Sequence, residues 1–405
     1  MSKVDLIIIG AGPGGYSAAE YAAKKGLKVV IFEGSEVGGT CLNVGCIPTK
    51  TYVHSSTFDE ARERMAAVVA QLRQGVEGIL SLPNITLVRE KGVFTDAHTI
   101  GDYTADNIII ATGSETKWLP IKGSDDPRVV DSTGLLQLET LPKRLAIIGA
   151  GVIGMEFASV FNRFGSEVTV IEYLKECLPA LDSDIAKRLR KYLEKQGITF
   201  KMKTAVENIA DIEADVILMA TGRKPRVQAD FANAGIEYDK RKGVTVDENF
   251  KTTVNGIYAI GDVNGRQMLA HAAEMQAIRA VNHIIGKKDA IDFNIMPAAI
   301  FTQPEAACVG PTEDQLKEQG IAYECKKSFW RANGKAMAMN ETEGMLKLFV
   351  SPDGLILGCH AYGAHSADIV QEVSVLMCKH TTIAELADMV HIHPTLSEIL
   401  KTAVD

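Results

Sequence analysis

The chain has 405 residues, of which 46% are hydrophobic and 23% charged, proportions that are ordinary for a soluble globular protein of several domains. Its formal net charge of −8 and its lack of a basic run argue against binding to nucleic acid or to an anionic membrane surface. No apolar run reaches the roughly 18 residues of a transmembrane helix, and the run Leu6–Ile9 is too short for a signal peptide, so we expect a cytoplasmic protein with neither a nucleic-acid nor a membrane partner.

The N-terminal region reads as a dinucleotide-binding βαβ unit. Residues 4–9 predict a buried strand, and the turn Gly10-Ala11-Gly12-Pro13-Gly14-Gly15 has G-x-G-x-x-G spacing and opens an alanine-rich helix to about Lys25. A second strand, Lys28–Phe32, ends at Glu33. In such a unit Gly10 makes the turn, Gly12 lets the backbone approach a pyrophosphate, and Gly15 lets helix and strand pack closely. Glu33 is placed to bind the adenosine ribose.

The same unit recurs later in the chain. A strand at Leu145–Ile148 leads into Gly149-Ala150-Gly151-Val152-Ile153-Gly154, and the strand Glu167–Ile171 ends at Glu172. The acid follows the first glycine by 23 residues in both units. Two fingerprints predict two different dinucleotides. Glu172 favours NAD over NADP because its charge would repel a 2′-phosphate, and Lys175 is the nearby cation that weakens this preference.

Three further strands carry small or acidic residues at their carboxyl ends. Each unit is followed by a strand ending in Ala-Thr-Gly, Ile108–Gly113 and Val216–Gly222, which supports an internal repeat. A later apolar strand delivers Asp262, which can bind a sugar-like hydroxyl chain or, alternatively, make an ordinary turn with Gly261. The stretch Met268-Leu269-Ala270-His271 opens a helix to about Ile285, whose N-terminus can face a phosphate or an electron-rich ring edge.

The stretch Gly38–Lys50 contains two cysteines five positions apart. On a regular helix Cys41 and Cys46 would be turned about 140° from each other, with alpha carbons over about 8 Å apart. A disulfide needs roughly 7 Å or less. Either the pair does not bond, or the backbone is distorted, which Gly45 permits. In the cytoplasm a bonded pair is more consistent with catalysis than with structure. The other cysteines are interpreted as packing residues: 177, 308, 325, 359 and 378.

From about Ile295 the pattern changes to an α+β module with an antiparallel sheet. Its predicted strands and helices are Ala298–Phe301, Met345–Val350, Ile356–Tyr362, Ala367–Lys379 and Ile383–Met389. Near the end, Pro394 predicts the first position of a helix, so that Glu398, about one turn in, can reach back to a ring nitrogen of His393. A carboxylate-oriented imidazole suits general acid/base work, and a structural His-Pro turn is the alternative. We expect no metal site, since His391 and His393 have no cluster of further ligands.

Together these motifs resemble the class I pyridine nucleotide-disulfide oxidoreductases, and within them most of all the dihydrolipoamide dehydrogenases. The resemblance runs from about Val4 to Leu400 and is most specific at Gly39–Lys50 and His393–Glu398. It implies an α/β fold with two Rossmann-like dinucleotide-binding domains, for FAD and NAD, and a C-terminal α+β dimerisation domain. The implied bounds are 1–115 with 244–292 for the FAD domain, 116–243 for the NAD domain and 293–405 for the interface domain.

The resemblance also implies which residues bind the two cofactors. Asp262 would hold the flavin ribityl chain, and Lys50 would lie near the flavin N5, paired with Glu156. The implied FAD residues are Gly10, Gly12, Pro13, Gly14, Gly15, Glu33, Gly39, Thr40, Lys50, Gly92, Ala111, Asp262, Met268, Leu269, Ala270 and His271. The implied NAD residues are Gly149, Gly151, Val152, Ile153, Gly154, Glu172, Val206, Gly222 and Arg223.

The implied reaction is oxidation of dihydrolipoamide by NAD⁺ through a Cys41–Cys46 disulfide. Cys41 would exchange with substrate and Cys46 would contact the flavin. His393, oriented by Glu398, would come from the partner subunit of a homodimer and take the substrate thiol proton, because only a thiolate attacks a disulfide well. The implied catalytic set is Cys41, Cys46, His393, Glu398, Lys50 and Glu156. The partner would be a lipoyl-bearing protein of a 2-oxo acid dehydrogenase complex or of the glycine cleavage system.

Two other functions remain open. One is an NADH-dependent reductase of another small disulfide, although the first helix, with no arginine between Tyr16 and Glu20, favours a small neutral substrate such as lipoamide. The other is a non-catalytic, redox-sensing flavoprotein subunit of a large complex. The chain is shorter than typical family members, with shortened stretches at 50–111 and 203–215 and an end soon after Glu398. We expect these losses to affect the interface and partner docking more than the chemistry.

Overall fold

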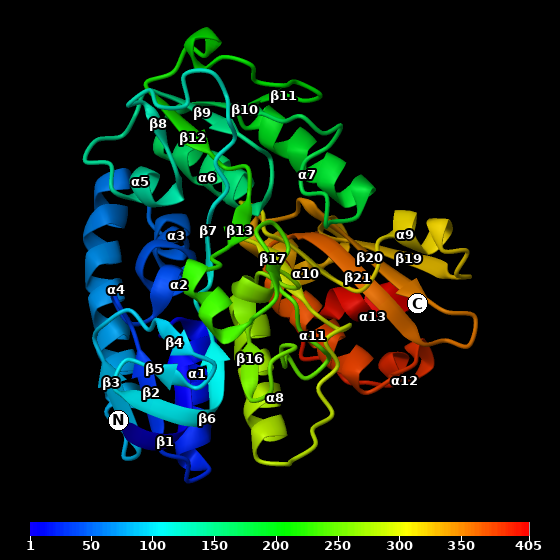
Figure 1. The fold of residues 1–405 in the computed structure, drawn as a ribbon. Helices are drawn as coiled ribbons and strands as arrows, with labels where there is room; N and C mark the ends of the chain where they lie inside the picture. Colours follow the sequence, from blue (N-terminus) through cyan, green and yellow to red (C-terminus); the bar gives the residue numbers. More distant parts are fainter. Residues whose placement is uncertain (405) are drawn as a thin grey trace. The chain divides into compact units, whose positions relative to one another are not determined.

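The computed structural model describes residues 1–404, which divide into two compact units. The first unit holds residues 1–118 and 222–291, and the second holds residues 119–221 and the chain from Asp292 onward. Parallel sheets with helices, and one antiparallel sheet near the C-terminus, confirm the α/β class with an α+β module (Figure 1). The three-domain bounds predicted from the sequence remain a proposal.

A seven-stranded sheet forms the centre of the first unit, in the order β3-β2-β1-β6-β5-β4, with β16 also paired to β6. Strand β5 pairs antiparallel with both β4 and β6, and the other pairs in the sheet are parallel. A central parallel strand is covered on both faces and needs a continuous apolar run; accordingly, Leu6–Ile9 are buried. The bounds are β1 Ser2–Ile9, β2 Val29–Phe32, β3 Ile85–Val88, β4 Phe94–Asp96, β5 Thr99–Ile100, β6 Tyr103–Ile110 and β16 Ile257–Ala259.

The helices of the first unit lie beside this sheet, with α1 packed against α8, and α4 against both α2 and α3 (Figure 1). Their bounds are α1 Pro13–Lys24, α2 Gly39–Val44, α3 Cys46–Val53, α4 Phe58–Leu80 and α8 Ala270–Ile284. Helix α8 begins two residues later than the predicted start at Met268, because Leu269 is extended. Short elements complete the unit: β7 Ser114–Thr116, β13 Arg223–Pro225, β14 Tyr238–Asp239, β15 Gly243–Val244, and the 3₁₀ turns η2 Ala229–Ala234 and η3 Gly261–Asn264.

The second unit contains a five-stranded parallel sheet in the order β11-β10-β9-β12-β8. The predicted strand at Glu167–Ile171 has the bounds that the sequence gives it. The elements are β8 Val129–Val130, α5 Ser132–Leu136, β9 Arg144–Ile148, α6 Val152–Phe164, β10 Glu167–Ile171, α7 Ser183–Lys195, β11 Thr199–Lys201, η1 Ile209–Asp211 and β12 Val216–Met219.

An antiparallel sheet in the order β17-β18-β21-β20-β19 completes the second unit. We did not predict β19, whose lysines interrupt the apolar pattern, or the short strand β18. The strands are β17 Ala298–Ile300, β18 Ala306–Val309, β19 Glu324–Phe329, β20 Gly344–Val350 and β21 Ile356–Gly363. The helices are α9 Glu313–Glu318, η4 Trp330–Ala332, α10 Gly334–Met339, α11 Ser366–Cys378, α12 Ile383–Ala387 and α13 Glu398–Val404.

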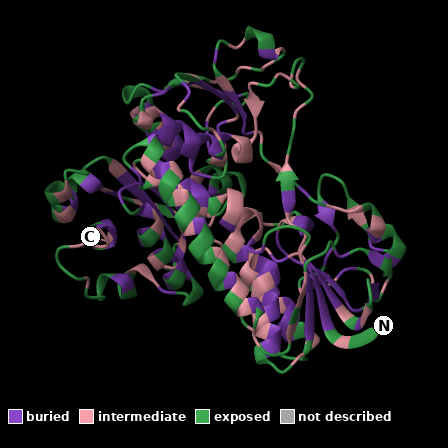
Figure 2. Cartoon of the chain, turned by 90° about the vertical axis from the view of Figure 1, so that its left-hand side faces the viewer, coloured by how far each residue is buried: buried purple, intermediate pink, exposed green. Residues whose placement is uncertain are grey.

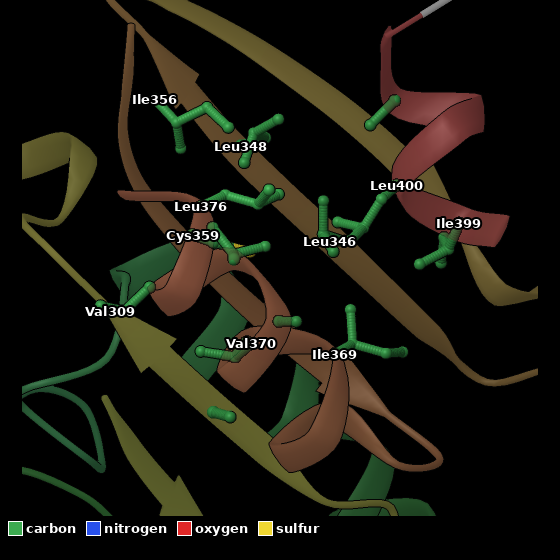
Figure 3. Close-up of a cluster of buried hydrophobic side chains, with 14 of the residues drawn as sticks. Val309, Leu346, Leu348, Ile356, Cys359, Ile369, Val370, Leu376, Ile399 and Leu400 are labelled. Carbon is green, nitrogen blue, oxygen red and sulfur yellow. The ribbon is translucent and has the colours of Figure 1, made fainter. Parts of the chain in front are cut away.

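Burial follows this arrangement: the strands are largely buried, and most helices bury one face, whereas α6 is buried on all sides over residues 154–161 (Figure 2). In the C-terminal module, side chains of α11 and α13 meet those of the sheet in one apolar cluster, which includes Leu346, Ile369 and Leu400 (Figure 3). Because Ile399 and Leu400 are fixed in this cluster, the position of the preceding Glu398 is fixed as well. No helix among residues 1–404 has both the length and the apolar character to cross a membrane.

Candidate active site

The first fingerprint closes tightly at the carboxyl end of β1. A methyl group on Gly15 would lie 1.8 Å from the Gly10 carbonyl oxygen, and one on Gly10, whose φ is +101°, would lie 2.5 Å from the Ala111 carbonyl oxygen. A methyl group on Gly92 would lie 3.1 Å from side-chain carbons of both Ile9 and Phe32. These contacts explain why glycine is needed at the turn. They gather Gly10, Gly15, Gly92 and Ala111 at one sheet edge.

The acid after β2 is fixed by the backbone of the same turn. The Glu33 carboxylate accepts hydrogen bonds from the Ala11 N–H at 2.7 Å and from the Ser35 N–H at 2.9 Å. Each carboxylate oxygen still has a second lone pair, so the group remains able to accept a hydroxyl hydrogen bond.

The second fingerprint repeats this geometry. A methyl on Gly154 would lie 2.0 Å from the Gly149 carbonyl oxygen, and one on Gly149 would lie 2.5 Å from the Ala220 carbonyl oxygen. The Glu172 carboxylate accepts from the Ala150 N–H at 2.6 Å and from the Leu174 N–H at 2.7 Å. Val152 and Ile153 occupy the first turn of α6, where Val152 is 44% exposed. Val206 packs on the apolar cluster of this sheet.

The space around the middle glycine of each fingerprint shows whether a nucleotide fits there. A methyl on Gly151 would meet no protein atom within 4 Å, and one on Gly12 would meet only Gly39, at 3.9 Å. Protein packing therefore does not require glycine at either position, whereas a pyrophosphate lying against the turn would. Helices α1 and α6 begin at these turns, and their first N–H groups have no partner within the helix. The two turns fit dinucleotides.

Asp262 belongs to a hydrogen-bonded chain in the first unit. The Ser114 hydroxyl donates to its carboxylate at 2.5 Å, and the Arg223 Nε donates to the Ser114 Oγ at 2.7 Å. Burial raises the pKa of Asp262, while the bond from Ser114 and the charge of Arg223 oppose that rise. Arg223, which we assigned to NAD, thus lies beside the residue that we assigned to the flavin ribityl chain, and Val206 belongs to the other unit.

Two polar residues that support Asp262 were missed in the sequence. Ser114 is one. The other is the fully buried Gln276 of α8, whose Oε1 accepts from the Gly261 N–H and from the Asn264 Nδ2, both at 2.8 Å. A glutamine on the apolar face of α8 is the signal that could have revealed it, because a buried amide needs partners.

The cysteines lie on either side of a break between two helices. Gly45 separates α2 from α3 with φ of −137° and ψ of −109°, far from helical values, so the backbone distortion considered above is present. The Cys41 thiol is hydrogen-bonded to the Cys46 side chain. That bond, burial and the charge of Cys46 raise the pKa of Cys41, and Lys50 one turn along α3 lowers it.

The redox stretch begins directly against the first fingerprint. Gly39 is the first residue of α2 and has φ of +60°, and a methyl there would lie 2.8 Å from the Gly12 alpha carbon. Thr40 follows in the same turn of the helix. The cysteine pair is therefore anchored at the turn where a dinucleotide fits.

His393 and Glu398 are in contact, as the sequence predicts. The His393 Nδ1 and the Glu398 Oε1 are 2.9 Å apart, and the Thr395 N–H donates to the Glu398 Oε2 at 2.9 Å. The bond from Thr395, and then the one with His393, lower the pKa of Glu398. The His393 side chain is 80% exposed.

The prediction that a helix begins at Pro394 was wrong, since α13 begins at Glu398. The backbone before it is held by tertiary contacts instead: the Asn333 Nδ2 donates to the Thr395 carbonyl at 3.0 Å.

The remaining predicted site residues are spread over both units. Lys50 lies on α3 of the first unit, and Glu156 is buried on α6 of the second, where its carboxylate accepts from the Phe301 N–H at 2.9 Å. Met268 and Leu269 precede α8, and Ala270 and His271 begin it. Gly222 has φ of +95°.

The interpretation of the other cysteines as packing residues is correct for Cys177, Cys308 and Cys359, which are buried, and wrong for Cys378, which is exposed. Cys325 is half-buried.

Comparison with known proteins gives the family. Residues 4–277 match the family described as pyridine nucleotide-disulphide oxidoreductase, and residues 296–404 match its dimerisation domain. The chain belongs to the pyridine nucleotide-disulphide oxidoreductase family. It is a flavoprotein oxidoreductase, and the cofactors implied by the resemblance, FAD and NAD, are those of its relatives. The module predicted for subunit contact is the dimerisation domain.

Individual relatives cover nearly the whole chain. A mitochondrial dihydrolipoyl dehydrogenase of Pisum sativum is 37% identical over 98% of this chain and 90% of its own length. Dihydrolipoyl dehydrogenase 3 of Pseudomonas putida is 37% identical over 100% of this chain and 98% of its own. These alignments span 452 and 456 positions, so the relatives carry segments that this 405-residue chain lacks.

Among solved structures, the HOCl-induced flavoprotein disulfide reductase RclA of Escherichia coli has a TM-score of 0.93 with this chain. It is 33% identical and covers 99% of both chains.

Proposed function

We propose that this protein oxidises dihydrolipoamide with NAD⁺, using Cys41 and Cys46 as its redox pair. The observation that carries the proposal is the hydrogen-bonded thiol pair across Gly45, on a helix that starts against the first fingerprint turn. A dithiol at that place can exchange electrons with a bound flavin on one side and with a substrate disulfide or dithiol on the other. The family and the dihydrolipoyl dehydrogenase relatives support this reaction.

The exchange conserves atoms and electrons. One substrate thiolate attacks the Cys41–Cys46 disulfide at the Cys41 sulfur, forms a mixed disulfide and releases Cys46 as a thiolate. The second substrate thiolate displaces Cys41, so that cyclic lipoamide leaves and two electrons remain on the cysteine pair. Two substrate protons are released in the process. When bound, FAD and NAD supply the onward two-electron transfer.

His393 is the proposed base for the substrate protons. With the Nδ1 directed at the Glu398 carboxylate, the Nε2 is the nitrogen available to a thiol. The lowered pKa of Glu398 keeps this carboxylate ionised, and its contact with the Nδ1 fixes the orientation of the ring. The substrate thiol thereby becomes a thiolate, the form that attacks sulfur.

We propose that the site is completed by a second copy of the chain. The 80% exposure of His393 supports this, as do its neighbours Val390 and Ile392, which are 98% and 79% exposed. Apolar side chains that exposed are expected where another surface covers them. The dimerisation domain is the part of the chain that would bind the second copy. In this proposal the catalytic and cofactor residues assigned in the sequence, Lys50 and Glu156 among them, keep their roles.

The substrate side of Cys41 favours an uncharged molecule. Burial raises the pKa of Tyr16 on α1 to about 12, and the nearby charges of Glu274 and Cys41 add to this rise. Tyr16 therefore lies near both Cys41 and Glu274, and its helix α1 has no arginine to bind an anionic disulfide. Neutral lipoamide fits better than glutathione disulfide. A lipoyl-bearing protein in the cytoplasm is the proposed partner.

The second candidate is an NADH-dependent reductase of a different small disulfide. The 33% identity and TM-score of 0.93 with RclA, a disulfide reductase, favour it. A non-catalytic flavoprotein subunit is the third, and any steady-state turnover dismisses it.

A direct assay separates these candidates. Purified holoenzyme is given dihydrolipoamide with NAD⁺, and in parallel NADH with lipoamide, glutathione disulfide or coenzyme A disulfide. The proposal predicts the highest kcat/KM for the lipoamide pair. A higher value for another disulfide would make the second candidate correct.

A matched pair of variants tests the role of the cysteines. Cys46→Ser abolishes turnover in this mechanism, whereas Cys378→Ser, at an exposed cysteine of the dimerisation domain, leaves it unchanged. Turnover of Cys46→Ser at the wild-type rate would refute the disulfide mechanism.

A further inference from the structure

The short helix α2 carries Cys41 but has little to stabilise it by itself. It is six residues long, has no side-chain N-cap bond, and ends at the non-helical Gly45. Isolated helices of this length are not stable in water. Contacts with the rest of the first unit must therefore hold α2, and with it Cys41, in place.

Asn43 provides the most complete of these contacts. Its Nδ2 donates to the carbonyls of Val37 and Gly39, both at 2.9 Å. Its Oδ1 accepts from the Nε of Arg73 at 3.0 Å and from the Nη2 of Arg73 at 2.8 Å. A carboxamide has two N–H donors and two acceptor lone pairs. All four are used, so Asn43 is held in a single orientation.

Arg73 links this amide to the long helix α4 (Figure 1). Besides its two bonds to Asn43, its Nη1 lies 3.4 Å from the Glu36 carboxylate. The side chains of Arg73 and Glu36 are 33% and 54% exposed, so the ion pair itself contributes little, and the paired N–H donors to Asn43 matter more. Arg73 thus joins α4 to α2 and to the loop before it.

The cysteines themselves do not take part in this contact. Gly39 and Asn43 are four residues apart on one face of α2, and Cys41, two residues from each, lies about 200° away on the other face. Gly39 is also the residue that packs against Gly12. Arg73 and Asn43 therefore act on Cys41 only through the position and rotation of α2.

We infer that the Arg73–Asn43 contact positions Cys41 for disulfide formation with Cys46 and so sets the dithiol–disulfide equilibrium of the pair. Disulfide geometry is restrictive, and holding two thiols at bonding distance raises their effective concentration. Without the contact α2 can rotate or fray, and the disulfide loses stability relative to the dithiol. This inference rests on the proposed role of the cysteine pair and assigns Arg73 and Asn43 as positioning residues.

The test measures the equilibrium directly rather than turnover. Holoenzyme is equilibrated in mixtures of reduced and oxidised dithiothreitol, where the two electrons and two protons gained by the cysteines come from the buffer dithiol. The disulfide fraction is then read by thiol alkylation and mass spectrometry. For Arg73→Met we expect about a tenfold loss of disulfide stability, which is about 30 mV for a two-electron couple.

Two further variants make the result specific. Arg73→Lys keeps the charge but not the two parallel donors. The stability of its disulfide should therefore lie between those of Arg73→Met and the wild type. Arg89→Met is the matched control, because Arg89 pairs with Glu77 of the same helix α4 and forms no hydrogen bond with the described residues 36–43; the bond with Glu77 is the largest of the effects that raise the pKa of Arg89, and the charge of Glu36 is the smallest. It should leave the equilibrium unchanged.

The outcomes are distinct. An equilibrium within twofold of wild type in Arg73→Met overturns the inference; if that variant does not fold, the same result in Arg73→Lys does so. A shift of equal size in Arg89→Met overturns it too, since the effect would then be general to α4. A shift confined to Arg73, in a protein that does not oxidise dihydrolipoamide, supports the positioning role while refuting the proposed substrate. If the wild-type protein forms no Cys41–Cys46 disulfide, both the positioning role and the proposed function are refuted.

Discussion

In the first fingerprint unit the Glu33 carboxylate accepts hydrogen bonds from Ala11 and Ser35, and in the second the Glu172 carboxylate accepts them from Ala150 and Leu174. The first glycines also agree, with φ of +101° at Gly10 and +106° at Gly149. One local sequence pattern has produced one local geometry twice, because the turn, the helix start and the acid are all set within about 25 residues.

The surroundings of the two turns differ. Gly12 has Gly39 and the redox stretch beside it, whereas no protein atom would meet a methyl on Gly151 within 4 Å. Within residues 1–404, the buried Asp, Glu, Lys and His residues all belong to the second unit: Glu156, Glu172, Asp182, Lys347 and His360. The shared turn therefore specifies a dinucleotide. The two copies differ in the residues around the turn, which are the redox stretch in the first unit and the buried charged residues in the second.

The largest effect is expected where each turn closes. Gly15→Ala places a methyl 1.8 Å from the Gly10 oxygen, and Gly154→Ala places one 2.0 Å from the Gly149 oxygen. Backbone must move in both. We expect Gly15→Ala to be purified without flavin, and Gly154→Ala to stay yellow but lose at least about a hundredfold in NAD⁺-dependent kcat/KM. Absorbance at flavin wavelengths and steady-state kinetics distinguish them; equal flavin loss in both would contradict two separate sites.

The buried charges predict that the second unit is sensitive to acid. The buried Lys347 ammonium contacts the carboxylates of Asp182 and Glu313, at 2.7 and 2.5 Å, and the neighbouring His360 Nδ1 accepts from the Asp182 N–H. Burial lowers the pKa of His360 from 6.5 to about 4. The imidazole is thus neutral in the folded protein, while the unfolded chain takes up a proton as the pH falls below 6.5. Stability is complete above that pH and declines towards pH 4.

This loss amounts to about 3 kcal/mol at pH 4 if His360 alone is responsible. Glu313, whose pKa is lowered from 4.5 to about 2, adds a loss of its own that begins only near pH 4.5, where the unfolded chain takes up its proton. His360→Asn keeps an acceptor for the Asp182 N–H without a titrating ring. Urea unfolding followed by circular dichroism at pH 7, 6, 5 and 4 should show a shallower decline in the variant. Parallel curves for the two proteins would rule out His360 as the cause.

An intermediate effect is expected at the two acids. In Glu172→Gln an amide N–H₂ must face the N–H of Ala150 or of Leu174, which costs about 1.5–3 kcal/mol in the nucleotide site. We expect KM for NAD⁺ to rise roughly tenfold to a hundredfold with the flavin retained. Glu33→Gln should instead weaken flavin binding and leave KM for NAD⁺ near wild type. Exchanged results would mean that the two turns bind the opposite cofactors.

The smallest effect is expected at Gly151. Since a methyl there meets no protein atom within 4 Å, Gly151→Ala should leave the melting temperature unchanged and raise KM for NAD⁺ a few-fold by keeping the pyrophosphate from the backbone. A lowered melting temperature with unchanged KM would show that the glycine serves the fold rather than the nucleotide.

The sequence alone determined whatever depends on neighbours in the chain. The strand, turn, helix and acid of both nucleotide units are local patterns. Helix geometry left a distorted backbone at Gly45 as one of two alternatives. The contact of His393 with Glu398 was predicted correctly, although the helix start on which that prediction was based was wrong.

The tertiary structure decided what depends on residues far apart in the chain. The four bonds of Asn43 need Arg73, 30 positions away, and the Lys347–Asp182 contact spans 165 positions. The turn that precedes α13 is bonded to Asn333, 62 positions away, which donates to the Thr395 carbonyl. A polar side chain in the sequence gives no sign of which distant partner will satisfy it. Burial imposes that choice, because an unpaired buried donor or charge is costly.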